Sequence, residues 1–95
     1  MNNYILGNDL LATCEAPDQL SYQFCIGYIT GIADALEMYR SAANRPRCIP
    51  ANAVSQLKDV VVKFLHDFPT VRHLGASTLV AMELSKAWDC GELFD

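Results

Sequence analysis

Apolar residues recur along the middle of the chain at the spacing of an α-helix. After Asp18, the clearest series repeats at i, i+4, i+7, i+11 and i+14, with these members: Cys25, Ile29, Ile32, Leu36 and Tyr39. This repeat places all five side chains on one face of a helix with 3.6 residues per turn. Asp18, which follows Pro17, is expected to cap the start of this helix.

A second apolar series predicts a helix further along the chain. Its members again fall at helical spacing: Val54, Leu57, Val61, Phe64, Leu65 and Phe68. Asn52 or Ser55 could cap its first turn. We expect Pro69 to end it, because the residue before a proline is pushed out of the α region.

Two shorter patterns predict one helix near each end of the chain. Residues 5–13 indicate a short first helix that runs into Cys14. The last helix is indicated by a further apolar series: Leu79, Val80, Met82, Leu84, Ala87 and Trp88. It should end near Cys90, with Gly91 in the left-handed conformation that often follows a helix.

Strands are not expected, because no period-two alternation persists anywhere in the sequence. The segment 43–50 contains two prolines and interrupts the helical pattern. The sequence therefore predicts an all-α fold: a compact bundle of about four helices, the second and third longest, in one domain spanning residues 1–95.

Composition narrows the possible partners. The chain has 95 residues, 52% of them hydrophobic and 19% charged, which is typical of a folded domain rather than a disordered chain. A net charge of −4 without a basic run argues against nucleic acid. The longest uncharged stretch, 19–33, is too short and too polar to span a bilayer.

Four cysteines are the most informative residues for cellular location. Cys14, Cys25, Cys48 and Cys90 form no C-x-x-C pair, so a structural metal site is disfavoured against two disulfides or four buried thiols. A domain this small gains much from disulfides, which form in an oxidising compartment: the periplasm, the cell exterior or the secretory lumen. The first residues do not read as a secretion signal, so we expect a signal peptide to have been removed or to lie outside this chain.

The cysteine positions favour one pairing among the three possible. In a simple up-down bundle, Cys14 and Cys25 lie near one end, and Cys48 and Cys90 near the other. We therefore favour Cys14–Cys25 and Cys48–Cys90.

Three small residues are aligned on the second predicted helix. Gly27, Gly31 and Ala35 recur every fourth residue, and glycine inside a helix costs about 1 kcal/mol relative to alanine. This cost suggests that another helix backbone comes close, either within the bundle, which we favour, or from another subunit.

Catalytic and cofactor-binding patterns are not found. Cys25 could in principle pair with His66 or His73 as a nucleophile and its base, but its place on the apolar stripe favours a buried or bonded sulfur. The carboxylates are scattered, and no phosphate-binding or metal-binding motif occurs, so we expect neither metal nor cofactor. The chain is expected to act by binding rather than by catalysis.

Several motifs together resemble one known family. They read Asn8-Asp9-Leu10-Leu11-Ala12-x-Cys14, Phe24-Cys25-x-Gly27-Tyr28-Ile29-x-Gly31-x-Ala33-Asp34, Cys48-Ile49-Pro50, and Gln56-Leu57-x-Asp59-Val60-Val61-Val62-Lys63-Phe64-Leu65. After Pro69 follow Arg72-His73, Leu79-Val80 and the closing Cys90. The chain thereby resembles the periplasmic immunity proteins of type VI secretion amidase effectors, the Tai-type or Rap immunity family. It departs from the usual Phe-Pro-Cys ending with Trp88-Asp89-Cys90.

This resemblance implies a function and a site. Family members bind a peptidoglycan amidase in the periplasm, are often dimeric, and push a loop into the Cys–His cleft of the enzyme. Here the first candidate loop consists of Asp67, Phe68, Pro69, Thr70, Val71, Arg72 and His73, and the second includes Asn44, Arg45 and Arg47. An acidic chain would also associate faster with a basic enzyme.

One alternative function belongs to another class. A small acidic helical protein of the periplasm could be a chaperone or stress protein that holds unfolded clients on exposed apolar surface. It would lack a single tight partner, whereas an immunity protein forms a stoichiometric complex with its amidase.

Overall fold

The computed structural model describes residues 4–91, which form four α-helices and one 3-10 helix. In chain order these are α1 (Gly7–Glu15), α2 (Gln19–Ala42), α3 (Val54–Asp67), η1 (Pro69–Val71) and α4 (Ala76–Ala87). The described residues contain no strand, only an isolated bridge between Leu6 and Gly75. The all-α prediction and the relative lengths of the helices are confirmed.

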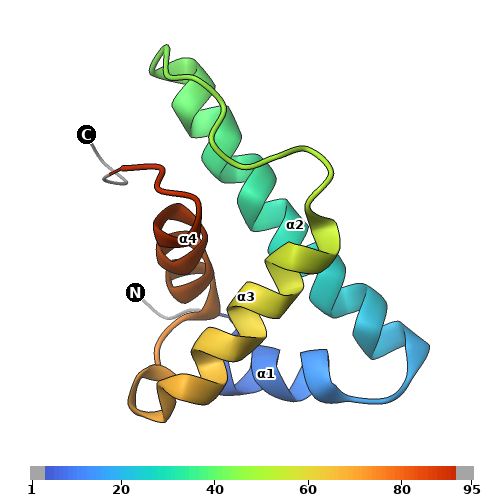
Figure 1. Cartoon of the computed structure of the whole chain (residues 1–95). Helices are drawn as coiled ribbons and strands as arrows, with labels where there is room; N and C mark the ends of the chain where they lie inside the picture. Colours follow the sequence, from blue (N-terminus) through green and yellow to red (C-terminus); the bar gives the residue numbers. More distant parts are fainter. Residues whose placement is uncertain (1–3, 92–95) are drawn as a thin grey trace.

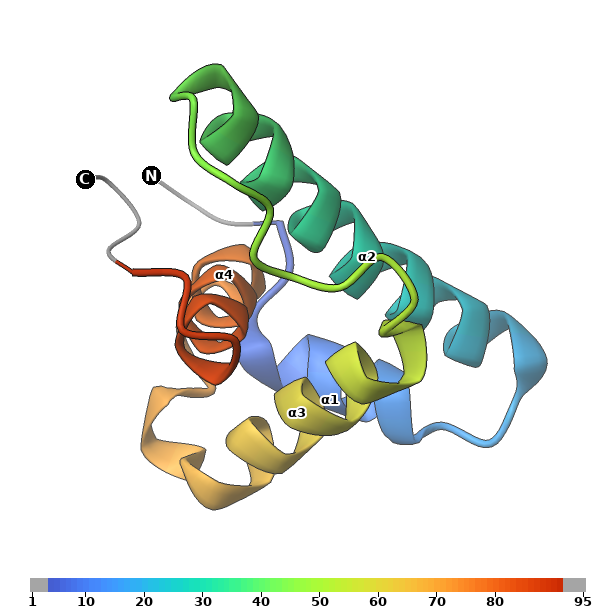
Figure 2. The same cartoon turned by 45° about the horizontal axis from the view of Figure 1, so that its top comes forward.

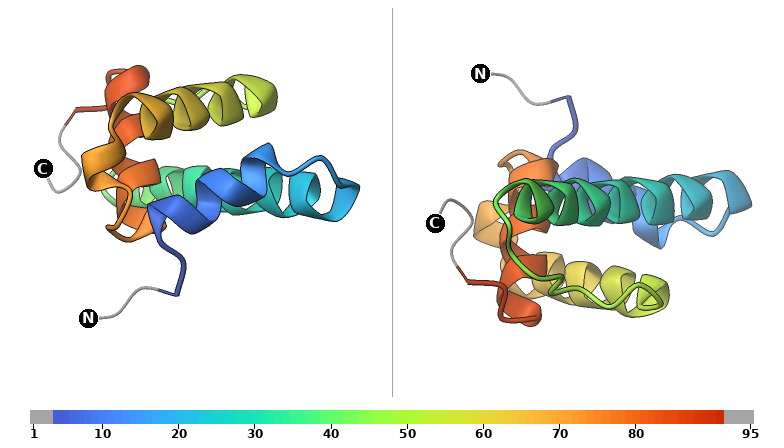
Figure 3. Two further views of the ribbon diagram at one scale, coloured as in Figure 1. Left: turned by 90° about the horizontal axis from the view of Figure 1, so that it is seen from below. Right: turned by 90° about the horizontal axis from the view of Figure 1, so that it is seen from above.

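The helices are inclined to one another rather than aligned as an up-down bundle (Figure 1). α3 is inclined to α2, and α1 lies below both in that view. α4 runs across the other three, so it is seen nearly end on in Figure 1 and upright in Figure 3. The segment between α2 and α3 turns back along α2 before α3 begins (Figure 2). The simple up-down arrangement that we expected is therefore wrong.

One hydrophobic core draws on all four helices. Its most buried large side chains include Leu10 of α1, Ile29 of α2, Leu65 of α3 and Leu84 of α4, joined by Ile49 from the α2–α3 connection. Burying one such side chain contributes about 1.5–3 kcal/mol. α2 reaches this core through the face that carries Cys25, Ile29 and Ala33, so its opposite face stays on the surface.

Helix boundaries follow the predicted signals in part. Asp18 caps α2, because its carboxylate accepts a hydrogen bond from the Ser21 backbone N–H at 2.9 Å, and this bond lowers the pKa of Asp18. α3 ends before Pro69, as predicted. Its N-cap is Ala53, without a side-chain hydrogen bond, so the caps expected from Asn52 or Ser55 are wrong.

The end of α4 also differs from the sequence-based expectation. The helix stops at Ala87, and the left-handed residue that directly follows its C-cap is Asp89 (φ 52°). Gly91 has a positive φ as predicted, but it lies two residues further along.

Candidate functional site

The first candidate loop, residues 67–73, joins α3 to α4 at the lower left of Figure 1. Pro69 starts the short 3-10 helix η1, for which its fixed φ is suited. The Phe68 backbone N–H closes α3 on the Phe64 carbonyl at 3.0 Å, and the Val71 N–H bonds the Phe68 carbonyl at 3.2 Å. The loop therefore consists of consecutive hydrogen-bonded turns, which give it a defined shape.

Phe68 offers the largest apolar side chain of this loop. It is 49% exposed, and its ring leans on that of Phe64 with 5.2 Å between the centroids. Pro69, Thr70 and His73 are exposed beside it. An aromatic ring that is held on one side and open on the other is suited to enter a pocket of a partner.

Backbone hydrogen bonds tether the loop to the start of α1. The Gly7 N–H donates to the Leu74 carbonyl and the Asn8 N–H to the Arg72 carbonyl, each at 2.8 Å. The Ala76 N–H donates to the Ile5 carbonyl, also at 2.8 Å. The first N–H groups of a helix have no partner within the helix, so here Arg72 of the loop and Leu74, which directly follows the loop, supply two of the missing acceptors. The loop and α1 consequently hold each other in place.

Gly7 makes this close approach possible. A Cβ atom at this position would lie 2.9 Å from the Arg72 carbonyl oxygen, 3.0 Å from the Arg72 Cα and 2.8 Å from a methyl group of Leu79. The first two atoms belong to the backbone and cannot rotate away. This role could not be predicted from the sequence, because nothing local to Gly7 indicates the approach of residue 72.

Charged groups of the loop are partly engaged within the chain. Asp67 accepts a hydrogen bond from Lys63 Nζ at 2.7 Å, which raises the pKa of Lys63. Arg72 is half-buried, and its Nε has no acceptor among the described residues. A buried donor without an acceptor is uncommon in folded proteins. Arg72 is therefore less accessible to a partner than the sequence suggested, because its Nε is buried.

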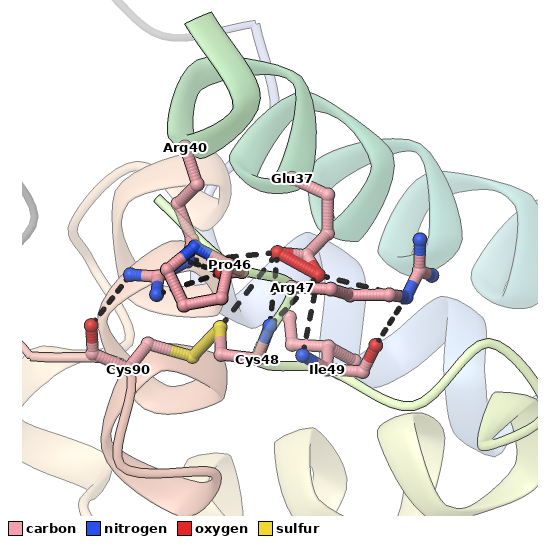
Figure 4. Close-up of a disulfide and its surroundings, with 7 residues drawn as sticks. All are labelled: Glu37, Arg40, Pro46, Arg47, Cys48, Ile49 and Cys90. Carbon is pink, nitrogen blue, oxygen red and sulfur yellow. Dashed lines mark hydrogen bonds and ion pairs between the residues drawn. A yellow bond between two sulfur atoms is a disulfide. The ribbon is translucent and has the colours of Figure 1, made fainter. Parts of the chain in front are cut away.

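The second candidate loop is held to α2 by a group of charged residues that we call the Glu37 clasp: Glu37, Arg40 and Arg47. The carboxylate of Glu37 accepts the backbone N–H groups of Cys48 at 3.1 Å and Ile49 at 3.3 Å (Figure 4). Arg40 donates to the carbonyls of Pro46 at 3.0 Å and Cys90 at 2.6 Å. The clasp thereby joins α2, the α2–α3 connection and the end of the last helical region.

Arg47 is less free than a candidate contact residue should be. Its Nε donates to the Ile49 carbonyl at 2.8 Å and lies 3.7 Å from a Glu37 oxygen. Asn44 is exposed in the left-handed conformation (φ 60°), and the Arg45 N–H is bonded to the Arg40 carbonyl. The second candidate loop is therefore held to α2 through its own side chains and backbone, whereas backbone groups hold the 67–73 loop to α1.

All four cysteines are bonded in the pairing favoured from the sequence, Cys14–Cys25 and Cys48–Cys90. Cys25, the thiol weighed as a nucleophile, is thus bonded and buried. His66 contacts the carboxylate of Glu15 across α3 and α1. Within residues 4–91, no three His, Cys, Asp or Glu side chains are arranged to hold a metal ion.

The small residues of α2 lie on its exposed side in the described part of the chain. Gly27, Gly31 and Ala35 are exposed, and a Cβ at either glycine would have no neighbouring atom of the described chain within 4 Å. The favoured prediction of close packing inside the bundle is therefore wrong. α2 buries its Cys25–Ile29–Ala33 face instead, which leaves the small residues on the outside.

These features define a class of protein. It is a small all-α domain with two disulfides and an exposed loop that backbone hydrogen bonds hold to α1. The chain belongs to the family of Rap1a immunity proteins, whose sequence pattern it matches over residues 6–90. Membership implies that it binds a cognate effector protein without a reaction of its own. No curated protein and no solved structure matches the chain.

Family and disulfides together indicate an exported protein. In the described part of the chain, no helix combines the length and the apolar character that a membrane crossing requires.

Proposed function

We propose that this protein neutralises a peptidoglycan amidase that type VI secretion delivers into the periplasm, by placing its 67–73 loop in the Cys–His cleft of the enzyme. The family match supports an immunity function. The observation that carries the site is the tether of this loop to α1 through Gly7 and Asn8. A loop that is already ordered loses little conformational entropy on binding.

The loop inhibits the amidase simply by occupying its catalytic cleft. Phe68 is the anchor that fills an apolar part of the cleft, and Pro69 keeps the turn behind it narrow. The exposed imidazole of His73 supplies a hydrogen-bonding group at the base of the loop. A loop seated in this way excludes the cell-wall peptide from the catalytic cysteine without any covalent step.

Charge supports fast capture of the effector. The net charge of −4 attracts a basic enzyme, and attraction over a distance raises the association rate more than the final affinity. In the periplasm, such capture competes with the first cleavage of the wall. We also propose that the chain acts there as a homodimer, as its resemblance to dimeric immunity proteins implies.

The first test removes the anchor. Phe68→Ala is expected to weaken binding to the cognate amidase by about 30-fold or more, because a central aromatic anchor contributes about 2 kcal/mol or more. Titration calorimetry measures the affinity, and co-expression with the amidase measures protection from lysis. Val54→Ala, at the opposite end of α3 and similarly exposed, should bind as the unaltered protein does.

Outcomes of this test separate the possible functions. Binding that is unchanged in Phe68→Ala would contradict loop insertion. Lysis that is equal with and without the unaltered protein would overturn the immunity function itself. A chaperone would instead suppress aggregation of unrelated clients and form no stoichiometric complex with the amidase.

Salt dependence gives a second prediction. Raising the ionic strength from about 0.01 M to 0.15 M shortens the screening length from about 30 Å to 8 Å. We expect the association rate with the amidase to fall at least several-fold, with a smaller change in the dissociation rate. Stopped-flow fluorescence measures both, and an association rate that is flat over this range would rule out electrostatic capture.

A further inference from the structure

A cavity of about 340 Å³ lies between α2, the α2–α3 connection and the start of α3. We call it the α2–α3 cavity, and its lining includes Thr30, Asp34, Arg47, Ile49 and Leu57. Its volume is at the lower end of the range for small-molecule sites in proteins, about 300–1,000 Å³. The cavity is at the opposite end of α3 from the 67–73 loop, so the proposed effector contact does not use it.

The inner wall of the α2–α3 cavity is apolar. Ala33 of α2, Ile49 of the connection and Leu57 of α3 line it, and all three are buried. Ile26, which is partly buried, lines it beside them. These side chains can contact methyl groups of a ligand but cannot form hydrogen bonds with it. Polar recognition of a ligand therefore has to come from the more exposed residues of the lining.

One of these more exposed residues is a carboxylate without a partner. Thr30, Asp34 and Glu37 follow one another at i, i+4 and i+7, so they lie on one stripe of α2. Glu37 is engaged by the connection, as described above, and the Thr30 hydroxyl donates to the Ile26 carbonyl at 2.7 Å. Asp34 is exposed and makes no hydrogen bond or ion pair with residues 4–91. Its negative charge is available to a ligand in the cavity.

Arg47 supplies the opposite charge from the connection. Its Nε is held by the Ile49 carbonyl and lies beside Glu37, which fixes the guanidinium group. In Figure 4 the two terminal nitrogens extend past Glu37 along α2 and make no hydrogen bond. Such a pair of nitrogens can bind a carboxylate through two parallel hydrogen bonds. Because the side chain is already held, it loses little conformational entropy when a ligand binds.

We propose that the α2–α3 cavity binds a zwitterionic dipeptide with small apolar side chains. The carboxylate of the dipeptide binds the terminal nitrogens of Arg47, its ammonium group binds Asp34, and its side chains contact the inner wall. Asp34 and Arg47 form no ion pair with each other, so a ligand can lie between them. An extended dipeptide spans about 7 Å. A simple anion or cation would leave one of the two charged residues without a partner.

Dipeptides of this chemistry come from two sources outside the cytoplasm. Protein breakdown releases peptides of L-amino acids, whereas the bacterial cell wall contains D-amino acids. The two kinds of dipeptide have the same charges and the same atoms, so only their configuration distinguishes the sources. In either case the ligand bridges α2 and the connection, and it should stabilise the folded protein because the unfolded chain has no such cavity.

Calorimetric titration with L-Ala-L-Ala and with D-Ala-D-Ala tests the site. We expect at least one of them to bind with a dissociation constant of about 1 mM or lower, as a small ligand held by two charge contacts should. In NMR spectra, the amide signals of Asp34 and Arg47 should shift, while those of residues 67–73 should not. Binding of one configuration alone supports the proposal and identifies the source, and binding of both supports a site that does not distinguish them.

Substitutions test the two charge contacts separately. Asp34→Asn and Arg47→Gln should each weaken binding at least tenfold, because one charged end of the dipeptide then has no partner. Acetylation of the ligand's amino group should weaken binding to the unaltered protein but not to Asp34→Asn. Amidation of its carboxylate should likewise have no further effect on Arg47→Gln. Asp59→Asn and Arg45→Gln remove the same charges outside the cavity and are the matched controls.

Three results would overturn the proposal. The first is that neither dipeptide binds at concentrations up to about 10 mM. The second is that the two cavity variants bind as tightly as the unaltered protein. The third is that capping the ligand weakens binding to the variants as much as to the unaltered protein, because the substitutions would then act through the fold. Thermal unfolding checks that the variants are folded. The test uses no amidase, so its outcome is independent of the proposed immunity function.

Discussion

Gly7→Ala is expected to destabilise the protein and to disable the loop that we propose for effector binding. The added methyl group would lie within 3.0 Å of two backbone atoms of Arg72 and 2.8 Å from a Leu79 methyl group. Leu79 can shift a little, but the backbone of residue 72 must move outward. That movement breaks the two hydrogen bonds from the start of α1, at Gly7 and Asn8. Overpacking of this kind costs about 1–3 kcal/mol.

Thermal unfolding and effector titration measure the two consequences of Gly7→Ala. A loss of about 2 kcal/mol lowers the melting temperature by roughly 8–16 °C in a domain of this size. Affinity for the amidase should fall at least tenfold, because the loop must then be ordered on binding. Asn8→Ala is the matched control, since it removes an exposed side chain and keeps the backbone hydrogen bond. If Gly7→Ala kept the melting temperature and the affinity of the unaltered protein, the tether between α1 and the loop would not be needed for stability or for effector binding.

Local signals in the sequence were sufficient to predict the helices. The i, i+4, i+7 repeat that ends at Tyr39 predicted α2, and the carboxylate of Asp18 marked its start, because a cap acts within three residues. Pro69 marked the end of α3 for the same reason: its steric effect falls on the residue before it. The start of α3 had no such marker, since Ala53 caps it without a side-chain hydrogen bond.

Contacts between distant residues could not be predicted in the same way. Gly7 and Arg72 meet only because α4 crosses the other helices and brings the loop back to α1. Gly27 and Gly31 suggested close packing inside the bundle, whereas both glycines lie on the exposed side of α2 in the described chain. The spacing of the cysteines gave the right pairing although the helices do not form an up-down bundle. That pairing depends on which helix ends meet, and less on the angles between the helices.

Glu37 shows most clearly that contacts between distant residues cannot be predicted from the sequence, because in the sequence it resembles an ordinary surface carboxylate. Its side chain is 11% exposed and accepts two backbone N–H groups while Arg40 and Arg47 lie 3.7 Å away. Glu37→Gln keeps the shape but removes the charge, and one end of the amide is then an N–H₂ group facing N–H donors. Leaving buried donors and an arginine without their acceptor should cost about 2–4 kcal/mol.

This loss is expected to appear first in the α2–α3 connection. Urea unfolding of the oxidised protein should give a lower midpoint with a similar slope, and trypsin should cut at Arg47 faster than in the unaltered protein. Asp59→Asn, at an exposed carboxylate of α3, is the control and should change neither the urea midpoint nor the rate of cutting at Arg47. Equal midpoints and equal cutting at Arg47 would mean that the Cys48–Cys90 disulfide holds this segment without the clasp. Faster cutting instead identifies Glu37 as the residue that keeps the connection, and with it Cys48, seated against α2.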